Sequence, residues 1–124
     1  MVGVTVTIDQ LFDPEYAIKY GTSAPVDWDD PETIHVLTKC VKLALADYNI
    51  QTRTDYRFVN IEMATWELSS VCIFHITFKA RNAQNNKFTT FQATTHHNRL
   101  MRMVHYIRIK GRSTGCSGSL SELI

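Results

Sequence analysis

The sequence predicts an α+β fold in which one long helix packs across an antiparallel meander of four or five strands. One segment of the 124-residue chain repeats apolar residues at steps of three and four, as a helix with one buried face does. Later segments alternate apolar and polar residues and are joined by short links, which is typical of consecutive antiparallel strands. The helix and the sheet each have one apolar face, so the simplest core lies between them.

The helix is predicted over residues 31–48. Asp30 can cap its first backbone N–H groups, and Pro31 suits the first helical position. Asp47 lies off the apolar stripe, so we expect it to face water. Asn49 is expected to end the helix because asparagine tolerates the left-handed conformation. The apolar stripe comprises Ile34, Leu37, Val41, Leu45 and Tyr48, with Ala44 beside it.

The strands of the meander are predicted over residues 56–68, 71–80, 88–97 and about 102–110. In the first strand the apolar positions change phase after Phe58, which predicts a β-bulge near Phe58 and Val59 and places Ile61 and Met63 in the new phase. The last strand alternates Met103, Ile107 and Ile109 with cations. We therefore expect one polar face, turned away from the helix and solvated. Its basic members are Lys79, Arg102, Arg108 and Lys110.

Segments on either side of this core complete the expected organisation. Residues 1–30 form an N-terminal strand and arm, with the strand over residues 2–8 and an aromatic residue such as Tyr16, Tyr20 or Trp28 anchoring the arm. Residues 31–110 form the core domain, and residues 111–124 form a flexible Ser/Gly-rich tail.

Charge is distributed unevenly along the chain. Residues 1–67 carry 11 acidic and 5 basic residues, whereas residues 68–121 carry 8 basic residues and no acidic one, and the formal net charge is +1. Opposite charges can meet within the folded domain, or the molecule can steer an anionic partner or associate head to tail as a homo-oligomer. Binding of nucleic acid or another anion by the basic face is therefore one alternative function.

Several classes of function lack their usual motifs. The chain has no Gly-rich phosphate loop, no nucleophile elbow and no paired carboxylates, so we expect no enzyme and no cofactor. The histidines lack metal-ligand spacing, so we expect no metal. Three cysteines without a CxxC pair favour a reducing compartment. With no signal peptide or membrane-spanning segment apparent, we expect a cytoplasmic or nuclear protein that does not bind membranes.

Three short stretches resemble the cystatin superfamily, most closely plant cystatins and plant cystatin-like proteins. Residues 40–49 partly match the helix pattern L-A-R-F-A-V-x-E-H/Y-N, and residues 76–80 and 91–93 are similar to the third and fourth strands of the family. The resemblance covers roughly residues 31–110 and implies the cystatin-like helix and sheet. It also implies a wedge of loops that blocks the active-site cleft of a papain-like protease by occlusion, without presenting a cleavable bond.

The inhibitory motifs of that family are degenerate in this chain. The first hairpin loop, Q-x-V-x-G in inhibitors, corresponds to residues 67–71, so that Glu67 replaces Gln and Val71 replaces Gly. A β-branched residue lacks the backbone freedom of glycine. The Pro-Trp pair of the second hairpin corresponds to residues 98–100, and Gly21 can stand for the glycine of the N-terminal trunk.

We therefore expect a non-catalytic module that binds another protein, with a papain-like cysteine-protease inhibitor as the alternative. The expected protein-binding edge comprises Gly21, Glu67, Leu68, Ser69, Ser70, Val71, Asn98, Arg99 and Leu100.

Overall fold

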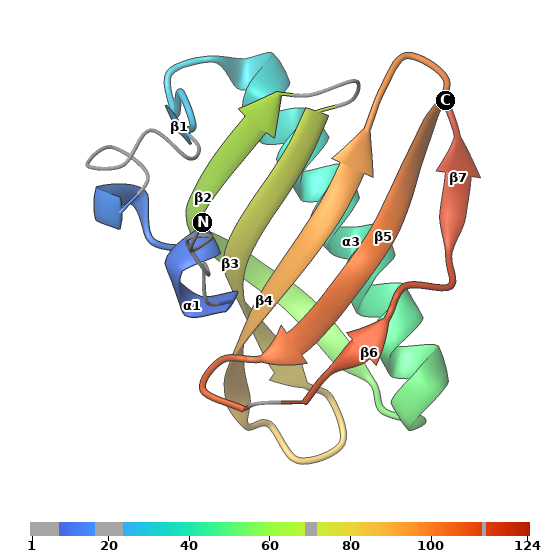
Figure 1. Cartoon of the computed structure of the whole chain (residues 1–124). Helices are drawn as coiled ribbons and strands as arrows, with labels where there is room; N and C mark the ends of the chain where they lie inside the picture. Colours follow the sequence, from blue (N-terminus) through green and yellow to red (C-terminus); the bar gives the residue numbers. More distant parts are fainter. Residues whose placement is uncertain (1–7, 17–23, 69–71, 113) are drawn as a thin grey trace, which may run out of the picture.

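The computed structural model describes residues 8–16, 24–68, 72–112 and 114–124. One 22-residue helix, α3 (Pro31–Thr52), crosses an antiparallel meander of β2 (Tyr56–Leu68), β3 (Cys72–Asn82), β4 (Phe88–His97) and β5 (Met101–Ile109) (Figure 1). Three short strands extend the sheet: β1 (Ala24–Pro25), β6 (Cys116–Ser117) and β7 (Ser121–Leu123). A short helix, α1 (Ile8–Leu11), precedes them in the chain. The predicted α+β class is confirmed, and the arrangement of helix and meander resembles the cystatin fold.

The core lies between α3 and one face of the sheet. Leu37 and Val41 are fully buried and Leu45 is almost so, which confirms the apolar stripe of the helix. From the sheet, the rings of Phe78 and Phe91 stack with centroids 5.6 Å apart. Each such side chain contributes about 1.5–3 kcal/mol through burial, so this interface is the main source of stability in the fold.

The helix begins where the sequence predicts and ends four residues later. The Asp30 carboxylate accepts hydrogen bonds from the Glu32 N–H at 3.1 Å and the Thr33 hydroxyl at 2.9 Å. At the other end, the prediction that Asn49 terminates the helix is wrong. Arg53 adopts the left-handed conformation (φ 57°) and its N–H donates to the Asn49 carbonyl. The helix therefore gains one turn beyond its apolar stripe.

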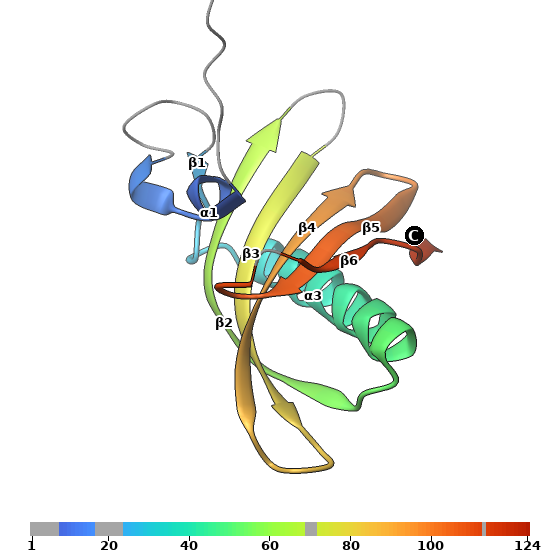
Figure 2. The same cartoon turned by 60° about the horizontal axis from the view of Figure 1, so that its bottom comes forward.

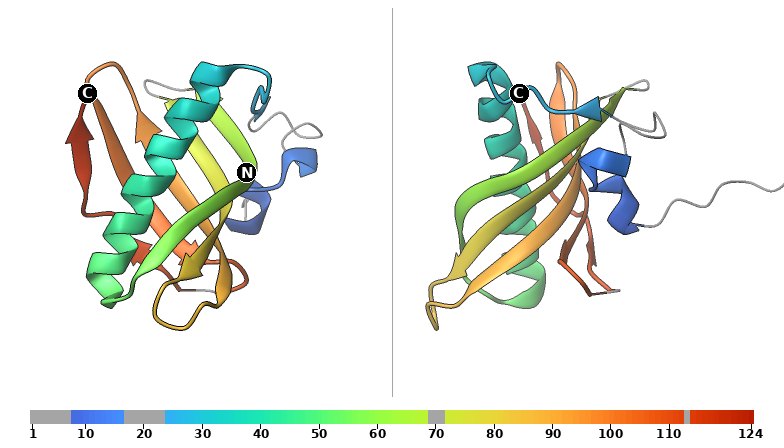
Figure 3. Two further views of the ribbon diagram at one scale, coloured as in Figure 1. Left: turned by 180° about the vertical axis from the view of Figure 1, so that it is seen from behind. Right: turned by 90° about the vertical axis from the view of Figure 1, so that its left-hand side faces the viewer.

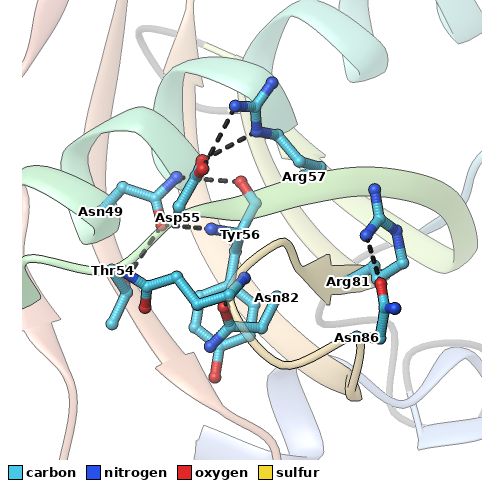
Figure 4. Close-up of polar contacts among 9 residues, drawn as sticks. Asn49, Thr54, Asp55, Tyr56, Arg57, Arg81, Asn82 and Asn86 are labelled. Atoms are coloured by element: carbon cyan, nitrogen blue, oxygen red, sulfur yellow. Dashed lines mark hydrogen bonds and ion pairs between the residues drawn. The ribbon is translucent and has the colours of Figure 1, made fainter.

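The side chain of Asn49 joins the helix to the first long strand instead (Figure 4). Its amide nitrogen donates to the Tyr56 carbonyl and its amide oxygen accepts from the Tyr56 N–H, both at 2.9 Å. The same oxygen accepts from the Thr54 hydroxyl at 3.1 Å. Asn49 thus satisfies the backbone of Tyr56 as a neighbouring strand would, and it fixes the direction in which β2 leaves the helix.

Bulges in the sheet determine which side chains face the helix. The pairing of β2 with β3 shifts between Phe58 and Asn60, which confirms the predicted bulge, and shifts again between Ile61 and Met63. The second shift pairs Met63 with Thr77 on the face away from the helix, so the expectation that Met63 shares the phase of Ile61 is wrong.

A third bulge lies in β5. Thr94 pairs with Tyr106 but the next residue, Thr95, pairs with Val104, so His105 is the extra residue. Arg102 consequently pairs with His97, and His97 in β4 pairs in turn with Cys72. Arg102 therefore lies on the face toward the helix, and the prediction that it shares a face with Arg108 is wrong.

The face of the sheet away from α3, called the open face below, is partly covered, where the sequence predicted a solvated face; Lys110 on this face stays exposed. The segment that contains α1 lies across it, with α3 on the opposite side of the sheet (Figure 3). Phe12 is 2% exposed and its ring meets the ring of His75 edge-on, with centroids 5.4 Å apart. The Thr65 hydroxyl donates to the Leu11 carbonyl at 2.8 Å. Burial of His75 and Thr65 follows from this cover.

The N-terminal predictions hold only in part. Ile8 begins helix α1 and not the end of a strand, whereas residues 2–7 lie outside the described residues. Phe12 anchors the arm, since it is buried against His75. Trp28 does not, since it is 46% exposed. Tyr16 is half-buried, and Tyr20 lies outside the described residues.

The segment after residue 110 forms two strands, where the sequence predicted a loose tail. β6 pairs with β5 at Tyr106 and Ile107 (Figure 2). β7 pairs with β5 over residues 101–103 (Figure 1). The Asp47 carboxylate holds the turn between them through the Ser119 N–H at 2.7 Å and the Leu120 N–H at 3.1 Å. The buried Asp47 thus supplies the acceptors that this polar segment needs, and the prediction that Asp47 faces water is wrong.

Candidate functional site

The strand residues that flank the two predicted hairpin turns lie at the same end of the sheet. Leu68 pairs with Cys72, Cys72 with His97, and His97 with Arg102, which forms one row across four strands. β2 and β4 both end at this row of residues, β3 begins at it and β5 begins one residue before it (Figure 1). We call this region the hairpin end. Of the predicted protein-binding residues, Gly21 and the residues Ser69, Ser70 and Val71 lie outside the described residues.

The β4–β5 turn is held by the side chain of Asn98. Its carboxamide oxygen accepts from the N–H groups of Leu100 at 2.8 Å and Met101 at 2.9 Å, and the Asn98 N–H donates to the Met101 carbonyl. This local pattern is why asparagine favours such turns. It presents Arg99 and Leu100 outward, with Leu100 73% exposed.

Two further apolar residues lie beside this turn. The Ile124 N–H donates to the Leu100 carbonyl at 2.8 Å, and Leu123 pairs with Met101 at the edge of the sheet. Leu123 is 85% and Ile124 59% exposed. We call Leu100, Leu123 and Ile124 the Leu100 patch. The sequence prediction missed the last two because their segment was expected to be loose, although three apolar residues in its last five were a usable signal.

Glu67 lies on the open face and not at the tip of the first turn. It pairs with Ile73, and its carboxylate is 3.5 Å from Nε2 of His75. Burial lowers the pKa of His75, and the nearby Glu67 carboxylate opposes that shift. The Glu67 carboxylate therefore faces the buried His75 and not the turn. Leu68 is the last residue of β2 before the turn.

The four predicted anion-binding residues do not form one basic face. Lys79 pairs with Glu62 at 3.7 Å, and Arg102 forms an ion pair with Glu122 on the helix side. Arg108 is 4% exposed and its guanidinium donates to the side chain of Gln92 at 2.6 and 3.0 Å. Lys110 alone of the four is exposed.

Two histidines, His96 and His105, lie in contact, and the cysteines form no disulfide among the described residues. Nδ1 of His96 and Nε2 of His105 lie 2.6 Å apart, because the β5 bulge brings His105 beside β4. Among the described residues, no three His, Cys, Asp or Glu side chains are grouped as metal ligands. The three cysteines are free thiols, and burial raises the pKa of Cys40 to about 11.

Comparison of the chain with protein-family models, with characterised proteins and with solved structures gives no match. The resemblance to cystatins is therefore one of fold, carried by the helix and the meander. Within the part of the chain that the structure describes, no helix is long and apolar enough to cross a membrane.

Proposed function

We propose that this chain is a non-catalytic module that binds another protein through its hairpin end. The observation that carries the proposal is the Leu100 patch, in which Leu100, Leu123 and Ile124 are 73%, 85% and 59% exposed on hydrogen-bonded elements. Backbone pairing places these three residues next to one another at the edge of the sheet. Exposed large apolar residues in one region commonly mark protein interfaces. Because the turn and β7 are held by backbone hydrogen bonds, little ordering entropy opposes binding at this site.

The charges around the hairpin end suit a contact of this kind. Arg99 is exposed beside Leu100, and Arg102 behind it is already paired with Glu122. An apolar centre with an exposed cation, Arg99, at its rim matches the usual anatomy of a transient interface. The partner we expect is a protein with an apolar cleft and an acidic rim.

The test uses a photo-crosslinking amino acid at position 100 and, as a matched control, at position 88. Phe88 is 60% exposed at the opposite end of β4, so general stickiness would act equally at both positions. A partner captured only from position 100 is then purified, and its affinity for Leu100→Asp and Phe88→Asp is measured by calorimetry. We expect Leu100→Asp to weaken binding at least about tenfold and Phe88→Asp to leave it unchanged. Equal capture from both positions, or equal affinity of both variants, would contradict the proposal.

Inhibition of a papain-like protease is the second candidate. It is favoured by the exposure of Leu100 in the turn that corresponds to the second hairpin of the inhibitory wedge. Titration of papain decides between the two functions. Sub-micromolar inhibition that Leu100→Asp abolishes would establish the inhibitor, and no inhibition would leave the non-inhibitory module. Binding of nucleic acid is disfavoured because the four predicted anion-binding residues form no continuous basic face. Arg102 lies on the helix side of the sheet, and Arg108 is buried.

A further inference from the structure

The segment that contains α1 and the open face of the sheet form a pocket of about 560 Å³. Pockets for small molecules commonly span about 300–1,000 Å³, with apolar walls and a few polar groups. Phe12, Pro14 and Met63 supply the apolar walls here. Met63 lies on this face because the second bulge in β2 restores the alternation that the first bulge inverts, and the Phe12 ring contacts His75 there.

Gln92 lies in the sheet wall of the pocket, and its amide nitrogen has no acceptor among the described residues. The residue is 3% exposed, and its amide oxygen accepts from Nε and Nη2 of Arg108. A guanidinium can only donate, so the oxygen must face Arg108 and the nitrogen must face away from it. Among the residues that the structure describes, none accepts a hydrogen bond from this nitrogen. Gln92 Nε2 is not among the buried atoms of the described residues that lack a partner, so this NH₂ group reaches the surface of the pocket. A ligand in the pocket can therefore supply its acceptor.

The charges around Gln92 favour an anionic acceptor. Arg108 is 4% exposed and adjoins the amide, and Lys110, the residue that follows the end of β5, lines the same pocket. Within the described part of the chain Lys110 has no ion-pair partner. Asp13 and Glu15 line the pocket from the N-terminal segment, and both are exposed, as Lys110 is. Water therefore screens all three of these charges, and the buried Arg108 guanidinium is the charge that is screened least.

We propose that this pocket binds a small apolar carboxylate. Its apolar body lies against Phe12, Pro14 and Met63, and its carboxylate accepts a hydrogen bond from the amide nitrogen of Gln92 beside the ammonium of Lys110. This site lies on the open face, and Phe12 and Lys110 belong to neither hairpin turn. It therefore adds a ligand to a chain whose protein contact is proposed elsewhere, and its test is independent of that contact.

The experiment compares three probes that share one ring system: 2-naphthoate, 2-naphthamide and 2-naphthylmethylammonium. Binding is followed on the full chain by two-dimensional amide NMR, and Kd is obtained from the titration. We expect saturable binding of naphthoate with shifts at Met63, Gln92 and Lys110, at least about fivefold weaker binding of the amide and weaker binding still of the ammonium probe.

Three variants test the site itself. Met63→Trp fills the pocket and should abolish binding of naphthoate, and Lys110→Gln should weaken it about threefold or more. Lys87→Gln, an exposed lysine in the β3–β4 turn, is the matched control and should change nothing. Thermal unfolding of each variant separates a lost site from a lost fold. Absence of saturable binding, binding that survives Met63→Trp in a folded protein, or tighter binding of the ammonium probe would each overturn the proposal.

Discussion

Replacing Asp47 tests how the last segment of the chain is held. The Asp47 carboxylate is fully buried and accepts four hydrogen bonds, from the Ser119 N–H, the Ser119 hydroxyl, the Leu120 N–H and the Gln51 amide. Each hydrogen bond to a charged group contributes about 1.5–3 kcal/mol. The loss is limited because the freed segment can leave the helix and be solvated. We therefore expect Asp47→Ala to lower the free energy of unfolding by about 2–4 kcal/mol.

The assay combines urea unfolding with amide hydrogen exchange. In Asp47→Ala, the amide protons of Ser119 and Leu120 should exchange much faster, whereas those of β3 should lose protection only with the global stability. Asp47→Asn is the matched control, since it keeps the shape and one acceptor oxygen, and it should cost about half as much. A free energy of unfolding unchanged within about 0.5 kcal/mol in both variants would refute this account of the segment.

The same carboxylate gives a pH dependence of known sign. Burial alone would raise the pKa of Asp47, but the hydrogen bonds from Ser119, Gln51 and Leu120 outweigh it and lower the pKa below 3.8. A lowered folded-state pKa stabilises the protein above the unfolded value, and this contribution is lost as the pH falls through the folded value. The stability difference between wild type and Asp47→Ala should therefore shrink below pH 3.8, and a constant difference would contradict it.

Three further predictions concern other parts of the fold. Arg53→Gly should raise the free energy of unfolding by about 0.5–1 kcal/mol in urea titrations, because Arg53 adopts φ 57° at the end of the helix. Burial lowers the pKa of His75, His96 and His97 below 6.5, so the unfolded chain binds protons first and stability should fall as the pH drops from 6.5 through the folded values. Urea midpoints that stay constant across that range would exclude this. Cys40, with a pKa of about 11, should react with Ellman's reagent more slowly than the other two thiols, as mass spectrometry of partly labelled protein would show.

The helix and its packing could be predicted from the sequence because they depend on local signals. Asp30 and Pro31 mark the start by capping chemistry, and the spacing of Leu37, Val41 and Leu45 places them on one side of any helix. The end was misplaced because asparagine suits both a helix end and a side-chain bridge to another strand. Only the position of Tyr56 in space shows that Asn49 forms the bridge.

The candidate sites were less predictable because they depend on contacts between distant segments. Asp47 reads as a surface residue until residues 119 and 120 supply its donors, and those residues look like loose chain until Asp47 supplies their acceptor. The Leu100 patch has the same origin, since Leu123 and Ile124 join Leu100 only through the pairing of β7 with β5. Neither the β4–β5 turn nor the last segment of the chain predicts the Leu100 patch by itself.

The faces of the strands show a subtler limit, which is one of parity. In β2, the two extra residues Val59 and Glu62 invert the alternation and then restore it, so that Ala64 and Trp66 face the helix as an unbroken strand would place them. The first inversion was visible because apolar residues follow each other at 58 and 59. The second was not, because methionine at position 63 fits either face.

In β5 a single extra residue, His105, inverts everything before it and nothing restores the phase. Met103 and Ile107 then lie on opposite faces, although their spacing in the sequence is that of neighbours on one face. The prediction of a basic face with Arg102, Arg108 and Lys110 assumed an unbroken alternation along β5, and the bulge at His105 interrupts that alternation. The two bulges of β2 cancel and leave Met63 on the open face, whereas the bulge of β5 leaves Arg108 and Lys110 there without Arg102. An apolar pocket beside two cations therefore replaces the extended basic surface, and a small anion fits it better than a nucleic-acid backbone does.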